Sequence, residues 1–193
     1  MINDALNFLD EEITNYLKLQ GEMEDGDPAL VTVSQLTDQS GTVQFPSLGL
    51  VLTNIEEERI HKAQAPYTKT SDGVLRKVNP EIKLNLYVLI ASHHSDFHST
   101  GLIRLGYVID FFQAKHVFTP QTSPNLPDGI NKLVVEMITL TFEQQNHLWG
   151  TLGAKYMPSV LYKVRMLTVQ ASGKAPAETI REIQHRESGM PAT

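Results

Sequence analysis

FEQQNHLWGTLGAKYMPSVLYKVRML, residues 142–167, contains a helix signal followed directly by a strand signal. Thr141 directly precedes the stretch, and Gln144 lies three residues after Thr141. This is the spacing of a capping box. The pattern predicts a short helix from Phe142 to about Leu152. Gly153 follows the helix, and glycine is the residue that most readily adopts the left-handed conformation with which helices end.

The second part of the stretch, Ser159 to Val169, alternates in a way that predicts a strand. Pro158 separates it from the helix. One set of alternate residues is apolar, and the other contains the two cations in the middle of the strand. The sets are Val160, Tyr162, Val164 and Met166 on one face, and Leu161, Lys163, Arg165 and Leu167 on the other.

Further strand signals occur upstream. Ile82 to Ser92 is apolar on one face at its start and on both faces at its end, which is typical of a strand in the middle of a sheet. We therefore expect it to be a central strand. The other predicted strands are Leu30–Leu36, Leu48–Glu58 and Ile130–Phe142.

Two longer helices are also predicted. Residues Ile2 to Gln20 place apolar side chains at helical spacing, and Gly21 follows as a stop. Ser95 or Asp96 caps a second helix, in which we interpret Gly106 as a point of close packing. Its buried stripe is predicted to be Leu102, Leu105, Ile109 and Phe112.

This order of elements predicts an α+β fold: a single domain with one mixed or antiparallel sheet and about three helices. The chain has 193 residues, which suits one domain. We place the domain at residues 1–170. Residues 171–193 are mostly small and polar, so we expect a weakly helical or disordered tail.

A long connection, Glu57 to Pro80, is the first candidate for function. Long connections inside compact domains are often functional, and Asp72-Gly73 is a hairpin signal. We interpret the segment as a projecting loop or β-arm, with a plain surface loop as the alternative. Its candidate contact residues are Arg59, His61, Arg76 and Lys77.

Composition excludes several functional classes. A net charge of −6 argues against a general nucleic-acid binder, which would carry a basic stripe. The absence of cysteine excludes disulfides, thiolate zinc sites and a cysteine nucleophile. The longest apolar run is far shorter than the roughly 20 residues of a membrane span. We therefore expect no nucleic-acid partner and no direct membrane insertion.

Evidence for enzymatic chemistry is weak. His93, His94 and His98 lie near Asp96 and resemble a metal site, but a polar strand-to-helix turn explains them better. There is no nucleophile elbow, and the segment Gly150 to Lys155 lacks phosphate-loop spacing. We expect no catalytic residue, no metal and no cofactor. A small metal-dependent enzyme using the three histidines remains the alternative from another class.

Two features suit an interface between proteins. Glu136 is the one charge in the middle of its strand, opposite in sign to Lys163 and Arg165. If the strands are neighbours, these residues either form a cross-strand ion pair or face another subunit. Trp149 is expected in the core, with an interface role as the alternative.

Five segments together resemble the N-terminal domain of the tail-terminator, or tube-cap, family of extracellular contractile injection systems, such as antifeeding prophages and virulence cassettes. The longest is the stretch quoted first. The others are ALNFLDEEITNYL (5–17), LVLTNIEEER (50–59), NPEIKLNLYVLIAS (79–92) and GLIRLGYVIDFFQAKHVFTPQTSP (101–124). They span about residues 2–170 in the family's order.

The resemblance implies a structural protein that closes the inner tube and holds the last sheath ring, acting as a hexamer. Its implied partners are itself, the inner tube protein and the sheath protein. Synthesis and assembly in the cytoplasm are expected, for a particle that is released or membrane-associated. An adaptor between tube and baseplate, or an accessory cap, are alternatives within the same machine. Some relatives continue into a further C-terminal region, so an activity carried there is expected to be missing here.

Overall fold

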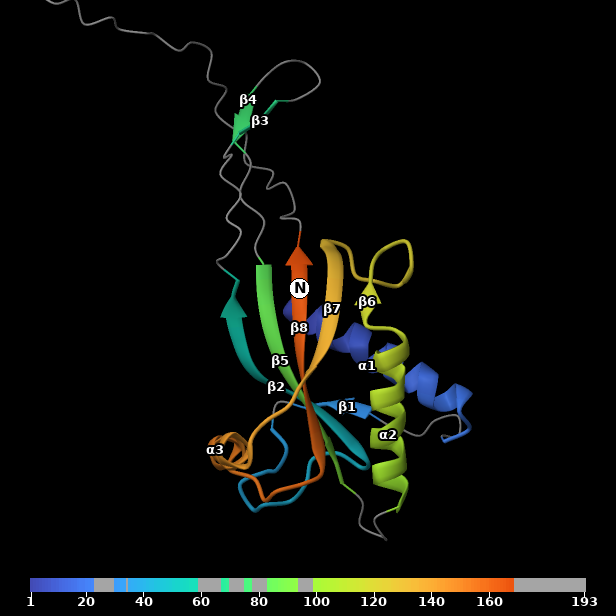
Figure 1. Ribbon diagram of the computed structural model, residues 1–193, viewed down its shortest axis with the longest axis vertical. Helices are drawn as coiled ribbons and strands as arrows, with labels where there is room; N and C mark the ends of the chain where they lie inside the picture. The colour runs from blue at the N-terminus through green and yellow to red at the C-terminus, as the bar shows by residue number, and fades with distance from the viewer. Residues whose placement is uncertain are drawn as a thin grey trace, which may run out of the picture.

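A computed structural model of the chain describes residues 1–22, 30–33, 35–58, 67–69, 75–77, 83–93 and 99–168. The described residues form an α+β domain around a six-stranded sheet (Figure 1). The helices are α1 (Ile2–Leu19), α2 (Ser99–Ala114) and α3 (Phe142–Leu152). The strands of the sheet are β1 (Leu30–Thr32), β2 (Leu48–Glu57), β5 (Lys83–Ser92), β6 (Val117–Phe118), β7 (Ile130–Ile138) and β8 (Ser159–Thr168).

The strand order is β1-β2-β5-β8-β7-β6. All neighbours are antiparallel except β1, which runs parallel to β2, so the sheet is mixed. β5 and β8 lie in the middle and pair over most of their length, from Lys83 opposite Leu167 to Ala91 opposite Ser159. The prediction that Ile82 to Ser92 forms a central strand is confirmed.

α1 and α2 cover one face of this sheet, which we call the helix face. In Figure 1, α1 passes behind the strands and α2 stands beside β7. Alternate residues of β5 and β8 point into this layer, as their spacing predicts. They are Leu84, Leu86, Val88 and Ile90 on β5, and Val160, Tyr162, Val164 and Met166 on β8.

The predicted stripe of α1 is confirmed, because Leu6, Leu9, Ile13 and Leu17 are all buried. In α2 the prediction for Leu105 and Phe112 is correct. The prediction that Leu102 is buried is wrong, because Leu102 lies in the first turn and is 48% exposed. Val108 and Phe111, in later turns, are buried in the core. Gly106 has open space where a Cβ would stand, so it is not a point of close packing.

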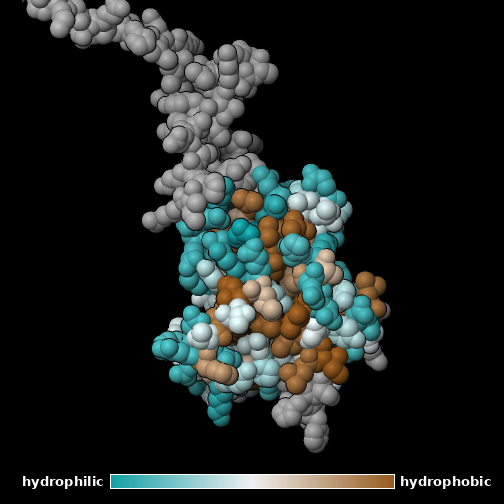
Figure 2. All heavy atoms as spheres, viewed as in Figure 1, coloured by the Kyte–Doolittle hydropathy of each residue, from teal (hydrophilic) through white to brown (hydrophobic). Residues whose placement is uncertain are grey.

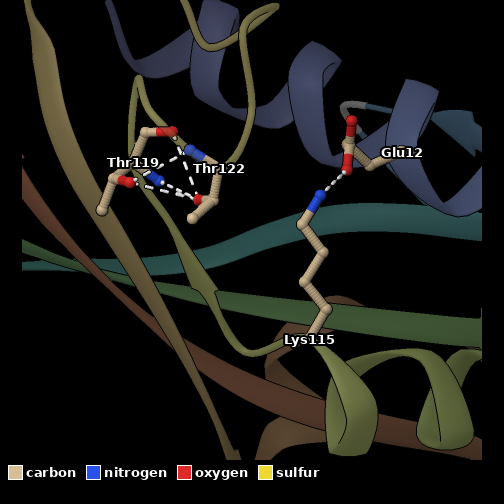
Figure 3. A network of polar contacts seen from close by, with 4 residues as sticks. All are labelled: Glu12, Lys115, Thr119 and Thr122. Atoms are coloured by element: carbon tan, nitrogen blue, oxygen red, sulfur yellow. Dashed lines mark hydrogen bonds and ion pairs between the residues drawn. The ribbon is translucent and has the colours of Figure 1, made fainter.

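An ion pair ties α1 to the end of α2 (Figure 3). Lys115 Nζ lies 2.7 Å from the Glu12 carboxylate and 4.9 Å from the centre of the Phe118 ring. Beside it, the Thr119 and Thr122 hydroxyls and amides bond to each other and close a turn directly after β6. This turn returns the chain toward β7, with which β6 pairs. β6 is not among the strands predicted from the sequence.

The opposite face of the sheet is covered over half its length by α3 and by the segment 35–47, which together form a second core. Gly49 on β2 faces the Phe45 ring there, and a Cβ at this position would lie 2.4 Å from a ring carbon. The second core consists of Leu36, Phe45, Val51, Leu89, Ala91, Trp149, Met157 and Leu161.

The connection from β2 to β5 contains the predicted hairpin, since β3 (Tyr67–Lys69) and β4 (Leu75–Lys77) pair antiparallel. Figure 1 draws this pair beyond the ends of β2 and β5. At the base of the connection, Glu58 N–H donates to the Lys83 carbonyl at 2.9 Å. The connection therefore begins and ends on adjacent strands.

Two predicted strands are shorter in the structure, and β1 ends at Thr32 where the prediction extended to Leu36. The strand predicted at Ile130–Phe142 ends at Ile138, because Thr141 is already the cap of α3. The predicted tail, residues 171–193, lies outside the described residues. No helix in the described residues is long and apolar enough to cross a membrane.

Candidate interaction surface

The half of the sheet that α3 leaves uncovered carries polar side chains, which we call the charged face: Glu56, Tyr87, Glu136, Lys163 and Arg165. They come from the four strands β2, β5, β8 and β7. α1 lies behind the strands in Figure 1, so the same view in Figure 2 looks onto this side of the sheet. Hydrophilic atoms gather over its upper left part there, and hydrophobic atoms over the middle and lower right.

β7 and β8 are neighbours, and their register decides how the predicted charges meet. Glu136 lies directly opposite Lys163. The carboxylate nevertheless forms its ion pair with the guanidinium of Arg165, which is diagonal to it. Both side chains remain 40–47% exposed, so solvent screens the pair, and its contribution is about 0.2–1 kcal/mol. The cross-strand ion pair predicted from sequence is present, with Arg165 as the cation.

Lys163 stays unpaired: no described residue forms an ion pair with its ammonium group. It lies between Glu136 on β7 and Tyr87 on β5 in the register of the sheet. An ammonium group offers three donors, and a free one is available to a carboxylate of another chain. Its position is consistent with a role in contact with a partner.

Tyr87 and Glu56 extend the charged face to β2, and the sequence analysis missed them. The Tyr87 hydroxyl donates to the Glu56 carboxylate at 2.7 Å. This hydrogen bond is the main cause that raises the pKa of Tyr87, with burial second. The signal available in the sequence was that Tyr87 is the one aromatic residue on the polar side of its strand.

Beneath the charged side chains, two polar atoms lack partners in the described part of the chain. Asn85, opposite Arg165, is only 5% exposed, and its Oδ1 accepts no hydrogen bond. The Nε of Arg165 is likewise buried without a partner. Such groups cost free energy when they are left unsatisfied.

α3 is placed by the local signals that predicted it. Thr141 Oγ1 accepts from Gln144 N–H at 3.2 Å, and Gln144 Oε1 accepts from Thr141 N–H at 3.0 Å. Gly153 adopts the left-handed conformation with φ 64°. The predicted bounds and the capping box of this helix are confirmed.

Trp149 on α3 is a core residue, as the sequence favours. It is 5% exposed and packs edge-on against the Tyr156 ring at 5.5 Å. Its indole Nε1 is buried without a hydrogen-bond partner among the described residues. A direct contact with another subunit would therefore involve its neighbours, such as Tyr156, which is 62% exposed.

The other candidate residues are only partly described. Arg59 and His61 lie outside the described residues, as do His94, Asp96 and His98. Arg76 and Lys77 lie on β4, apart from the charged face in the sheet topology. His93 packs edge-on against the Phe45 ring at 6.2 Å. Within the described ranges no three His, Asp or Glu side chains are grouped to hold a metal ion.

Comparison with known proteins identifies the family of the chain. Residues 5–182 match the family described as Pvc16 N-terminal domain. The chain belongs to the Pvc16 N-terminal domain family. The match extends over nearly the whole chain and includes α1 from Ala5 onward, α2, α3 and all strands of the sheet. A search of curated proteins found no match.

Two solved structures share the fold of this Pvc16 N-terminal domain. The sheath/tube terminator of an extracellular contractile injection system, PVC, in its extended state has a TM-score of 0.64 at 14% identity, covering 100% of this chain. The tube-terminating cap of the anti-feeding prophage has a TM-score of 0.55 at 12% identity, covering 92%. The chain spans 64% and 60% of the length of those two proteins. The tail-terminator-like fold expected from the sequence is confirmed.

Proposed function

We propose that this chain is a cap protein that terminates the inner tube and anchors the last sheath ring of a contractile injection particle. The observation that carries the proposal is the shared fold, which covers 100% of this chain for a sheath/tube terminator and 92% for a tube-terminating cap. The role is structural, and neither catalysis nor a cofactor is part of it.

The physical requirement for such a cap is simple. Rings that stack head to tail present the same free surface after each addition, so growth continues until a different protein blocks the end. A cap needs one surface complementary to the last ring and another that accepts no further ring. Chemistry on a bound small molecule is not needed.

We propose that six copies form a ring, in which the charged face contributes contacts between chains. The unpaired ammonium of Lys163 and the exposed Glu136–Arg165 pair support this assignment. Charges at such a surface select the partner and the register more than they add affinity. Residues 1–170 form the structural domain in this proposal, and residues 171–193 are a polar tail.

The length of particles tests the proposal. Negative-stain electron microscopy would compare particles from a producer strain with and without the gene, and with the gene restored. Overlong, ragged or unsheathed tubes in the deletion strain, and uniform tubes after restoration, are the expected result. Particles of uniform length with intact sheath in the deletion strain would refute the proposal.

Location within the particle separates the cap from an adaptor. Gold-labelled antibody against the chain is expected at the end distal to the baseplate. Label at the baseplate end would assign the protein to the junction between tube and baseplate.

A further inference from the structure

The outer edge of β7 is only partly paired. β6 covers Leu133 and Val134, and one further hydrogen bond joins Val135 N–H to the His116 carbonyl at 2.8 Å. Beyond it, no described strand pairs with Glu136–Ile138 on this side. In an antiparallel strand every second residue directs its N–H and C=O to the same side. Met137 therefore points both groups outward, as Val135 does.

A hollow lies on each face of this edge. On the helix face, an open hollow of about 350 Å³ is lined by Ile109, Phe112, His116 and Tyr162 together with Met137. On the other face, about 200 Å³ is lined by Leu140, Leu148 and Trp149, again with Met137. Met137 lines both hollows and is itself 57% exposed. An edge strand flanked in this way can take up the alternate side chains of an added strand.

Each hollow is also lined by one residue with a buried polar atom that has no hydrogen-bond partner among the described residues. Tyr162, whose hydroxyl lacks a partner, lines the larger hollow, and Trp149, whose Nε1–H lacks a partner, lines the smaller. Tyr162 is 2% exposed and Trp149 5%. Buried polar groups in folded proteins nearly always have partners. Both atoms are themselves inaccessible from the hollows, so an added strand is favoured by the free edge and by the shape of the hollows.

The lining determines the chemistry of the occupant. Neither hollow is lined by Asp, Glu, Lys or Arg, and His116 is the one basic side chain in either. A charged side chain placed there would lose its hydration without an ion-pair partner. An uncharged occupant is therefore favoured.

The two helices beside the β7 edge determine the shape of the occupant. α2 lines one hollow and α3 the other, so a helix flanks the edge on each face. The free edge is three residues long, which is too short to join two whole sheets but long enough to hold one extended segment between the helices.

We propose that the β7 edge at Glu136–Ile138 binds, by strand addition, an extended uncharged segment of another protein of the particle, whose alternate side chains enter the two hollows. The inference rests on the proposed function only where it names another protein of the particle as the origin of the bound segment. It assigns a second partner contact, which adjoins the charged face at Glu136.

Site-specific cross-linking tests the proposal directly. The chain has no cysteine, so Met137→Cys, labelled with benzophenone maleimide and assembled into particles, gives one attachment site. Leu19→Cys is the matched control, because Leu19 is 84% exposed at the far end of α1. Mass spectrometry is expected to find the Met137 product in an uncharged segment of a different particle protein, and no such product from Leu19→Cys. A product joining two copies of this chain, or no product, would overturn the inference.

A proline variant tests the role of the backbone. Met137→Pro removes an N–H that β8 does not use, and proline is tolerated at sheet edges. We expect at least a tenfold loss of the chain from purified particles with Met137→Pro, and near-normal occupancy with Met137→Leu, which keeps the N–H. Thermal unfolding of both isolated variants checks the fold. Normal occupancy of a folded Met137→Pro variant would contradict strand addition.

The two proposals fail separately. Suppose that gene deletion alters tube length, but that the Met137→Pro variant is incorporated normally and the Met137 cross-link gives no product with another protein. Only the inference of strand addition is then lost. If the cross-link forms as expected but deletion leaves tube length unchanged, only the termination function is lost.

Discussion

Glu136 on β7 and Arg165 on β8 form an ion pair along the diagonal of the sheet, not across a rung. The rung partner of Glu136 is Lys163, whose ammonium group is left without a described carboxylate. Arg165 thus contributes to the stability of the chain, and Lys163 is available for contact with another protein.

A double-mutant cycle should separate the two cations. Between Glu136→Ala and Arg165→Ala we expect a coupling free energy of roughly 0.2–1 kcal/mol, because the pair is exposed and screened. The cycle of Glu136→Ala with Lys163→Ala should give a smaller value. Urea unfolding of the purified chain measures both cycles, and a larger coupling to Lys163 would show that the diagonal pair is not the one formed in solution.

Charge reversal of the charged face should affect assembly more than folding. The double variant Lys163→Glu and Arg165→Glu is expected to remain folded, as checked by circular dichroism, and to be depleted from purified particles. Lys155→Glu serves as a control, because Lys155 is exposed in the turn after α3. Normal incorporation of the double variant would remove the charged face from the interface.

Two glycines should respond to alanine with opposite signs. Gly49→Ala places a Cβ within 2.4 Å of the buried Phe45 ring, and overpacking of this kind costs about 1–3 kcal/mol. Gly106→Ala lies in α2 with open space around the new methyl group, and should gain about 0.4–1 kcal/mol by restricting the unfolded chain. Shifts of thermal unfolding in the same direction for both variants would be inconsistent with the described packing.

The capping box should determine the local stability of α3. Thr141→Ala removes the acceptor for Gln144 N–H and is expected to cost about 1 kcal/mol. Hydrogen exchange should then show faster exchange of amides in α3 and little change in β5. Thr139→Ala, two residues earlier and exposed, should leave both unchanged; equal effects of the two variants would argue against the cap.

Two aspartates should give opposite pH dependence. Burial raises the pKa of Asp10, although Thr32 and Thr14 hydroxyls donate to it. The folded state therefore holds this proton more tightly, and stability is lost as pH rises from the ordinary aspartate value, about 3.8, through the raised one. Asp10→Asn escapes this loss, so its stability relative to wild type should rise between pH 3 and pH 7.

Asp38 provides the comparison. The Ser40 hydroxyl and the Thr42 amide donate to its carboxylate and lower its pKa. Its contribution is present above the ordinary value and is lost as pH falls through the lowered one. Asp38→Asn should therefore lose stability relative to wild type between pH 3 and pH 7. Urea unfolding at the two pH values tests both signs, and equal signs for the two variants would contradict the assignments.

Much of this fold follows from patterns within single elements. The alternation around Val164 grouped the residues that share the helix face of β8, and Thr141 with Gly153 predicted the bounds of α3. β6 was missed because a two-residue strand before Pro120 is too short to show a period.

The candidate site was less accessible to sequence reasoning, because it depends on how distant segments meet. Glu136 and Lys163 could be suspected of pairing once their strands were predicted, but the reach of Arg165 across the diagonal depends on side-chain geometry. The hollows beside Met137 combine residues from α2, α3, β7 and β8. No pattern within one segment indicates such a combination.

The 2.9 Å hydrogen bond from Glu58 N–H to the Lys83 carbonyl closes the base of the connection that carries β3 and β4. Because both ends leave from neighbouring strands, the body of the domain places almost no constraint on the length or sequence of what is inserted between them. A longer insert costs the domain little, because the entropy of closing a loop grows only slowly with its length. Related domains with the same body can therefore carry different inserts, each fitted to its own surroundings.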